Sequence, residues 1–535
     1  MADNREKDVG LHMGAEHVDN TTAVTGHAAD QEDHDETFIQ AFTRHKKACF
    51  WCFYACWTII LVAFDTQAGG AVIGIPEFRK DFGFKYGNDY VIPASWQSAF
   101  NGAPTASAVI FSLLAGDIAD RIGRKYTLAI ALAISYGAVG MEFAATTNAL
   151  FFGGKLLNGV AIGLIVTPMI SYISDVAPLR LRGFFTCFIG VAYGIGPLVA
   201  FIVVNYTGQL NSRWAYRTVF CCQFGFAAVA TALLPFLPES PWWLASKGRI
   251  DQTVTALQAL GNTPQQAEKK VALIQLTLEE VRRETEGVTY AECFRKSNLR
   301  RTIISIMPMC IQSFSGIGFV AGYFTYYLQL AGYSTDLSFK IQIAQPVLSI
   351  VGNLMAAATI NWIGGRNLTF YGLAILTVFL LITGGLGLGT ETPVVKGTVA
   401  FILIYSWWYN VSIGSTAFGL LSETSTSRLR VKTIAIGYAV SNSINVMWQF
   451  VIPFLFNPDK ANLGAKIAFI FGGLCFFCLL YLFYYQPETT GRSYQELDEM
   501  FAKGVPARKF KSYRTEAEMR NEAAGAVVEA KGLEN

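Results

Sequence analysis

Apolar stretches long enough to cross a lipid bilayer recur along most of the chain. A membrane-spanning helix needs about 20 consecutive apolar residues. The pattern therefore predicts an all-α membrane protein with twelve transmembrane helices in two sets of six, separated by a charged loop. The predicted spans lie near residues 48–70, 93–115, 126–146, 149–173, 184–206 and 218–237, and near 302–330, 341–363, 368–389, 396–421, 432–456 and 465–485.

The polar stretches between and around these spans predict the domain organisation. Residues 1–46 are polar, mixed in charge and without the apolar core of a signal peptide, so we expect a disordered tail. A six-helix bundle over 47–237 precedes a loop of short amphipathic helices over 238–300. A second six-helix bundle follows over 301–486, and a C-terminal tail over 487–535.

Composition supports a lipid-facing body and excludes other classes. The 535 residues are 52% hydrophobic and 15% charged, whereas soluble domains carry about 25% charged residues. The net charge of +3 and pI of 8.2 do not indicate a nucleic-acid binder, since such domains usually exceed about pI 9. All five histidines lie in the N-terminal tail. No nucleophile–base pair or metal-ligand cluster is apparent, so we expect a protein that is not an enzyme and uses no cofactor or metal.

Two motifs occur once in each half. An acidic residue followed by arginines at +5 and +7 comes after the fourth span, at Asp175, and after the tenth, at Glu423. Pro-Glu-Ser over 238–240 follows the sixth span, and Pro-Glu-Thr over 487–489 follows the twelfth. Both pairs are displaced by nearly the same number of residues. The halves are therefore predicted to be structural duplicates in the same orientation, an arrangement found in certain transporters.

Lysine and arginine collect near the ends of the spans on one side of the predicted membrane. Clusters precede the first and seventh spans and separate the second from the third and the tenth from the eleventh. Short cytoplasmic segments carry such an excess of positive charge. Both termini and the central loop are therefore expected to face the cytoplasm.

The turn between the second and third spans reads Gly-Asp-Ile-Ala-Asp-Arg-Ile-Gly-Arg-Lys over 116–125. Its acids and bases can pair with those after the fourth span. Charge pairs that form in only one conformation supply the energy difference that a two-state switch requires. We expect such a conformational charge network, the alternative being a plain positive-inside turn. Its predicted members are Asp120, Arg121, Arg124, Asp175, Arg182, Glu239, Glu423, Arg430 and Glu488.

Together, these motifs resemble the sugar porter family of the major facilitator superfamily over about residues 48–501. The resemblance rests on the segments 116–125, 154–163, 172–183, 238–244 and 487–492. The segments 322–327, 427–433, 457–460 and 464–466 are most similar to fungal α-glucoside (maltose-type) permeases. The resemblance implies the major facilitator fold, two pseudo-symmetric six-helix bundles in the plasma membrane.

Charged residues inside a membrane are expensive and usually functional. Asp65 lies near the outer end of the first span, flanked by apolar residues. The resemblance implies that this acid couples a proton to transport together with a base in the fourth span, which is Lys155 here. Lysine replaces the family's more frequent arginine and loses its bidentate geometry. Glu142 in the third span is a second candidate, alternatively a structural or interfacial residue, and Asp65 has the alternative of a hydrogen bond at a helix end.

The resemblance also implies a sugar site of amide and aromatic side chains in the second half. Gln312 is retained from the family pattern Gln-Gln-x-Ser-Gly-x-Asn, whereas Ser313 and Gly318 replace two larger amides and leave room for a second sugar ring. For Gln312 the alternative is a hydrogen bond between helices, and the same holds for Asn445. The predicted substrate-binding residues are Gln312, Asn445, Phe418, Asn410, Asn353 and Tyr323.

These observations predict a proton-coupled sugar uptake transporter that works by alternating access. Maltose or another α-glucoside is the expected substrate. The alternatives are a hexose symporter, a facilitative sugar uniporter and a non-transporting sugar sensor of the same fold. The expected partners are the sugar, the proton and the lipid bilayer, with no nucleic acid, and the sequence leaves the oligomeric state open.

Overall fold

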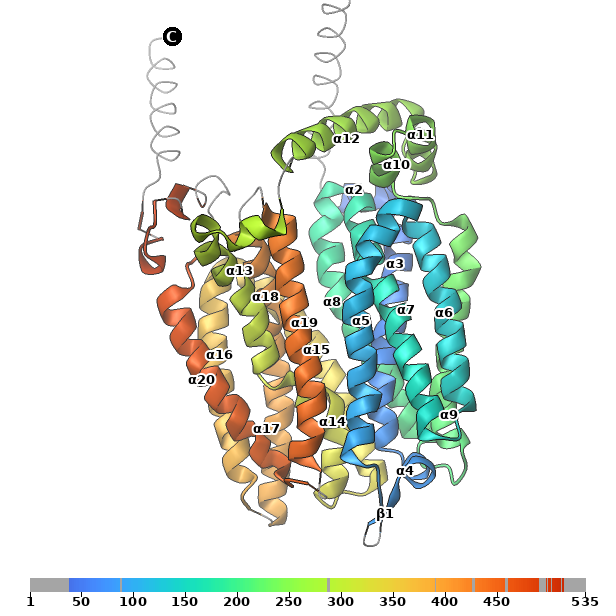
Figure 1. Ribbon diagram of the computed structural model, residues 1–535, viewed down its shortest axis with the longest axis vertical. Helices are drawn as coiled ribbons and strands as arrows, with labels where there is room; N and C mark the ends of the chain where they lie inside the picture. The colour runs from blue at the N-terminus through green and yellow to red at the C-terminus, as the bar shows by residue number, and fades with distance from the viewer. Residues whose placement is uncertain are drawn as a thin grey trace, which may run out of the picture.

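The computed structural model describes residues 38–86, 89–285, 289–389, 391–425, 429–457, 460–489, 497, 499–501, 503–510 and 512–513. Long helices run side by side through most of this part of the chain (Figure 1). A small antiparallel hairpin joins β1 (Phe84–Tyr86) to β2 (Asp89–Val91), with Lys85 opposite Tyr90. Residues 1–37 of the predicted N-terminal tail lie outside the described residues, and residues 38–44 of that tail form a short helix.

The first half follows the predicted order of spans. The short helix α2 (Phe38–Arg44) precedes its first long helix, and α4 (Pro76–Phe82) follows that helix. The six long helices are α3 (Lys46–Ile73), α5 (Ala94–Ile122), α6 (Arg124–Ala144), α7 (Asn148–Val176), α8 (Leu179–Thr207) and α9 (Trp214–Leu233).

The second half contains the same number of spans, but two of them are broken. The predicted span 302–330 is divided into α13 and α14, and the span 396–421 into α17 and α18. The helices of this half are α13 (Lys296–Phe314), α14 (Ile317–Leu330), α15 (Thr335–Ile363), α16 (Gly365–Leu386), α17 (Thr392–Val411), α18 (Ile413–Thr424), α19 (Arg430–Phe456) and α20 (Ile467–Tyr485).

Most of these spans have the length and hydropathy of a membrane helix. Among the described residues, ten helical stretches are long and apolar enough to cross a membrane. The remaining spans are α15 and the pair α17–α18, which contain several polar side chains. In α15 these include Gln342 and Gln345, which are both buried inside the protein. Such side chains are tolerated in a membrane because they face protein rather than lipid.

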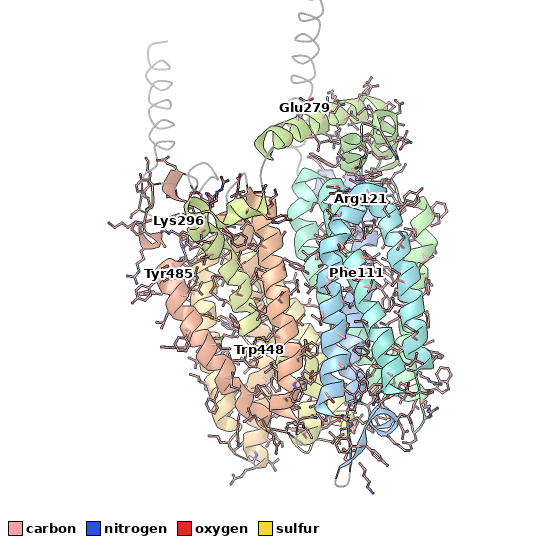
Figure 2. All side chains as sticks on the ribbon, viewed as in Figure 1. Phe111, Arg121, Glu279, Lys296, Trp448 and Tyr485 are labelled. Atoms are coloured by element: carbon pink, nitrogen blue, oxygen red, sulfur yellow. The ribbon has the colours of Figure 1, made fainter. Side chains whose placement is uncertain are left out.

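The two ends of the bundle differ. The central loop forms α10 (Pro241–Ser246), α11 (Ile250–Ala259) and α12 (Pro264–Thr285), which lie together at one end, the top of Figure 1. We call this the loop end, and we call the opposite end, with α4 and the β hairpin, the hairpin end. Figure 2 places Arg121, Glu279 and Lys296 at the loop end, whereas Phe111 and Trp448 lie within the bundle. Charged residues thus gather outside the apolar zone.

The halves meet mainly along three pairs of helices. α5 packs against α19, α8 against α15, and α3 against α14. Each half also has its own apolar core, containing Leu132 and Tyr172 in the first half and Leu376 and Tyr405 in the second.

Candidate functional site

Three charged side chains predicted from the sequence meet inside the first half. Asp65 comes from α3, Glu142 from α6 and Lys155 from α7, and their exposed fractions are 4%, 0% and 2%. The ammonium Nζ of Lys155 lies 3.1 Å from Oε2 of Glu142 and 3.5 Å from Oδ1 of Asp65. One cation therefore faces two carboxylates, and Glu142 belongs to the same cluster as the other two.

A fourth member of this cluster, Asn158, was not predicted. It lies three residues after Lys155, so both side chains project from the same face of α7. Its amide Nδ2 donates to Oε1 of Glu142 at 3.0 Å and also donates to Oδ1 of Asp65. The spacing of three residues from Lys155 was the only local signal for this role.

Glycine on α7 allows the cluster to form. A Cβ at Gly154 would lie 2.8 Å from Cγ of Glu142, closer than carbon atoms approach without strain. The absence of a side chain at this position lets α6 bring Glu142 against α7. On its apolar side, the ammonium of Lys155 lies 5.6 Å from the centre of the Phe220 ring, a favourable cation–π distance.

The electrostatics of the cluster favour a bound proton. With both carboxylates and Lys155 charged, these three side chains carry a net charge of −1 although they are almost fully buried. An unbalanced buried charge is strongly unfavourable. One proton on either Asp65 or Glu142 makes the set neutral, so the cluster is chemically suited to bind and release a proton.

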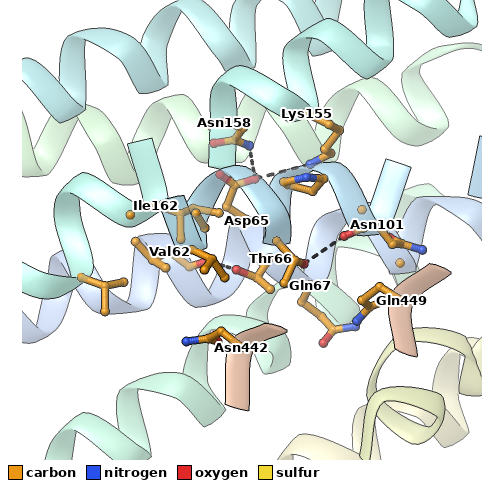
Figure 3. A pocket seen from close by; sticks show the side chains of 18 of the residues that line it. Val62, Asp65, Thr66, Gln67, Asn101, Lys155, Asn158, Ile162, Asn442 and Gln449 are labelled. Atoms are coloured by element: carbon orange, nitrogen blue, oxygen red, sulfur yellow. Dashed lines mark hydrogen bonds and ion pairs between the residues drawn. The ribbon is translucent and has the colours of Figure 1, made fainter. Parts of the chain in front are cut away.

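A cavity of about 270 Å³ lies between the two halves beside this cluster. Asp65, Lys155 and Asn158 line it, whereas Glu142 is not among the lining residues. Figure 3 shows Lys155 and Asn158 pointing at Asp65, with Asn442 and Gln449 of α19 on the other side of the space. The other polar side chains of the lining are Thr66, Gln67, Asn101, Thr105, Ser112, Tyr193 and Tyr438.

Hydrogen bonds join the two halves between the cavity and the hairpin end. Nε2 of Gln97 donates to Oδ1 of Asn457 at 2.9 Å, and Nε2 of Gln329 donates to the carbonyl oxygen of Gly74 at 2.8 Å. Closer to the cavity, Nδ2 of Asn101 donates to the hydroxyl of Tyr323 at 3.0 Å. The predicted sugar residue Tyr323 is thus buried in the contact between the halves.

Two predicted sugar residues lie at the helix breaks. Gly316, between α13 and α14, has φ +94°, and the break frees backbone carbonyl groups. Nε2 of Gln312 donates to the carbonyl oxygen of Gly414 at 3.0 Å, and Asn410 donates to Ser406 of its own helix at 2.8 Å. Gln312 therefore makes a hydrogen bond between helices, which was the alternative to sugar binding expected from the sequence. Neither Gln312 nor Asn410 lines the cavity.

The other predicted sugar residues lie around the cavity and not on its lining. Oδ1 of Asn353 accepts a hydrogen bond from Ser415 at 2.8 Å. Phe418 is 50% exposed, and its ring centre lies 6.4 Å from that of Tyr438. Asn445 is half-buried on α19. Its α19 neighbours that line the cavity are Tyr438, Asn442 and Gln449, which the sequence did not single out.

The predicted charge network of the first half is centred on the N-terminus of α6. Glu239 accepts a hydrogen bond from the backbone N–H of Arg124 at 2.9 Å. The Arg124 guanidinium lies 3.3 Å from Asp120 and 3.7 Å from Asp175. Asp175 also accepts a hydrogen bond from the hydroxyl of Ser240 at 2.6 Å.

The second half repeats this arrangement. Glu488 accepts from the backbone N–H of Asn367 at 3.3 Å, near the N-terminus of α16. Thr489 donates to Glu423 at 2.7 Å, as Ser240 does to Asp175. These contacts each join elements within one half. Arg121 is exposed at the end of α5, and the side chains of Arg182 and Arg430 lie outside the described residues.

Comparison with known proteins identifies the class. Residues 51–501 match the family model described as sugar (and other) transporter. A maltose permease of Saccharomyces cerevisiae is 31% identical over 513 residues, which cover 94% of this chain and 83% of the relative. An alpha-glucosides permease of the same organism is 31% identical over 500 residues, covering 91% of this chain and 83% of the relative.

Solved structures agree with the fold. The inward open xylose transporter XylE from E. coli matches with a TM-score of 0.69 at 20% identity, over 84% of this chain and 99% of that chain. The chain therefore belongs to the sugar transporter family and is a multi-pass membrane protein with the major facilitator fold. The predictions of family, of fold and of a transporter rather than an enzyme are confirmed.

Proposed function

We propose that this protein takes up an α-glucoside such as maltose together with a proton, by alternating access. The proposal is carried by one observation: Asp65 and Lys155 of the buried cluster form part of the wall of the central cavity, and Glu142 contacts Lys155 behind that wall. The relatives named as maltose and alpha-glucosides permeases support the substrate class. A structural neighbour described as a proton:xylose symporter supports the coupling.

The chemistry of the cavity supports a sugar substrate. Sugar hydroxyl groups both donate and accept hydrogen bonds, which carboxamide side chains can match in pairs. Besides Asn158, four carboxamides line the cavity from three other helices: Gln67, Asn101, Asn442 and Gln449. The ring of Tyr438 adds an aromatic surface for the apolar face of a sugar. The lining thus offers the few placed polar groups that a small-molecule site needs.

The position of Asp65 supports coupling. Its carboxylate lines the same cavity as these carboxamides and lies 3.5 Å from Lys155. During alternating access the carrier passes through a closed state in which water is excluded from the cavity. A proton that neutralises the cluster lowers the electrostatic free energy of that state. Sugar and proton then reach the same compartment in the same step.

The orientation remains part of the proposal. The protein is assigned to the plasma membrane. Its loop end faces the cytoplasm, and its hairpin end faces the outside of the cell. On this assignment, the hydrogen bonds of Gln97 and Gln329 close the outer side, and the conformation is inward-facing. The charge networks of the two halves then lie on the cytoplasmic side.

Uptake of labelled maltose by cells lacking sugar transporters tests the proposal. Wild-type uptake should rise as the external pH falls, because the cluster loads its proton from outside. Asp65→Asn should reduce accumulation by more than about tenfold, a free-energy change of about 1.4 kcal/mol or more. Asp251→Asn, on the exposed face of α11, is the matched control.

Two results would contradict the proposal. Uptake that ignores pH, together with normal accumulation by Asp65→Asn, would mean facilitated uniport. Failure of maltose and other α-glucosides to enter, while a hexose enters, would overturn the substrate class and leave the coupling intact.

A further inference from the structure

We propose that Asn158 is a positioning residue that controls proton release from the buried cluster, by stabilising the ionised forms of both carboxylates. This inference rests on the proposed proton coupling. It assigns to a neutral side chain a function separate from that of Lys155, and it explains why an amide stands at this position.

Asn158 connects the two carboxylates directly. It is 1% exposed and lies on α7, whereas Asp65 and Glu142 come from α3 and α6. One NH₂ group carries two hydrogens, and each of them is directed to a different carboxylate. Lys155 and Asn158, both on α7, thus donate hydrogen bonds to side chains of two other helices.

The surroundings of the carboxylates contain few other groups that could take over this role. The charged side chains of the cluster are Asp65, Glu142 and Lys155, so each carboxylate faces the other carboxylate and the lysine. From α9 the uncharged Gln223, fully buried, approaches Asp65. The rings of Phe151 and Phe220 cover the lysine. Water does not reach Glu142, which is 0% exposed.

Removing the amide has a defined electrostatic consequence. Hydrogen bonds donated to a carboxylate favour its ionised form, and a buried carboxylate without them is penalised. Without Asn158, the two carboxylates keep a single donor side chain on α7 for two negative charges. The cluster then holds its proton more firmly, and release into the internal solution requires a higher internal pH.

An amide also suits the protonated state. Oδ1 of Asn158 is buried and has no hydrogen-bond partner among the described residues. A half-turn of the carboxamide would present this oxygen to the O–H of a protonated carboxyl group. Leucine offers neither donor nor acceptor, whereas serine offers one of each through a single hydroxyl. The two substitutions therefore define a graded series.

The experiment uses the full chain reconstituted in liposomes, with two transport modes measured for each variant. In exchange of labelled for unlabelled maltose, the carrier changes conformation with sugar and proton bound, so the proton need not be released. Net accumulation driven by a proton gradient requires release of that proton inside. Asn158→Leu should lower net accumulation about tenfold more than it lowers exchange, and the dependence of net accumulation on internal pH should move to higher pH.

Two further variants complete the design. In Asn158→Ser, the dependence of net accumulation on internal pH should move to higher pH by a smaller amount. If the leucine variant does not fold, the serine variant provides the test. Ser107→Ala is the matched control, because the Ser107 hydroxyl joins α5 to α7 through Leu156 without contacting either carboxylate. It should retain both transport modes and the wild-type pH dependence.

The outcomes separate this inference from the proposed function. Equal loss of exchange and net accumulation in the Asn158 variants, or an unchanged pH dependence, would overturn the role of Asn158 while wild-type coupling stands. Absence of proton movement with maltose in the wild-type protein would instead overturn the proposed function, and this inference with it.

Discussion

At the scale of single residues, Lys155 is a buried cation that faces two carboxylates. It supplies one positive charge to two carboxylates, at 3.1 and 3.5 Å, with almost no exposure to solvent. Hydropathy and the family resemblance were sufficient to predict Asp65, Glu142 and Lys155, because a charge in an apolar stretch is conspicuous. Asn158 escaped prediction because a neutral amide in a membrane helix is common and its two partners lie on other helices.

Removal of the lysine charge should destabilise the protein in a pH-dependent way. Lys155→Met leaves two buried carboxylates without a cation, which should lower the stability at neutral pH by about 3 kcal/mol. Acidic pH should restore part of this stability, because protonated carboxyl groups no longer need the cation. Thermal unfolding in detergent across a pH series checks this prediction, with the exposed Lys247→Met as the control. If the Lys155→Met variant melts at the same temperature as the wild-type protein at neutral pH, the prediction is wrong.

At the scale of helices, the breaks in two spans of the second half are the main departure from the sequence pattern. Hydropathy is continuous through 302–330 and 396–421, so it predicted unbroken helices there. The breaks face one another through side chains: Gln312 donates to Gly414, and the hydroxyl of Tyr405 donates to the carbonyl of Ser315 at 2.7 Å. Backbone groups freed inside a membrane must find partners within the protein.

The break at Gly316 should not tolerate a side chain. Its φ of +94° is unfavourable for other residues, and a Cβ there would lie 2.8 Å from Cγ of Phe471. Gly316→Ala should lower the stability by about 1–3 kcal/mol. Gly473→Ala on α20 is the control, since no atom lies within 4 Å of its Cβ position. Comparison of melting temperatures tests this, and equal values for the two variants would contradict the strained break.

At the scale of the whole molecule, the two halves touch at the hairpin end through close backbone contact. A Cβ at Gly70 would lie 2.8 Å from the carbonyl oxygen of Gly322 on the opposite half. The hydrogen bonds of Gln97, Asn101 and Gln329 lie around the same contact. The sealed conformation therefore depends on the absence of a side chain at this position.

Gly70→Val should shift the carrier toward the state in which the hairpin end is open. The branched side chain cannot fit against Gly322, so we expect the sealed state to lose about 1.4 kcal/mol or more, a tenfold change in population. Labelling of a cysteine placed at Thr105, which lines the cavity and whose hydroxyl donates within its own helix, with a membrane-impermeant maleimide should become faster, and net transport should fall. Gly140→Val, on a side of α6 with open space, is the control. Unchanged labelling would show that the close contact does not limit the equilibrium.

The sequence by itself determined the spans, the duplicated halves, the family and the charged residues within the membrane. Each of these depends on the composition of a single segment or on a motif that can be read locally. Only the tertiary structure decided that Glu142 joins Asp65 and Lys155, that Asn158 connects both acids, and that Asn442 and Gln449 line the cavity while Asn445 does not. These relations depend on how closely helices distant in the sequence approach, which glycines such as Gly154 permit and hydropathy does not record.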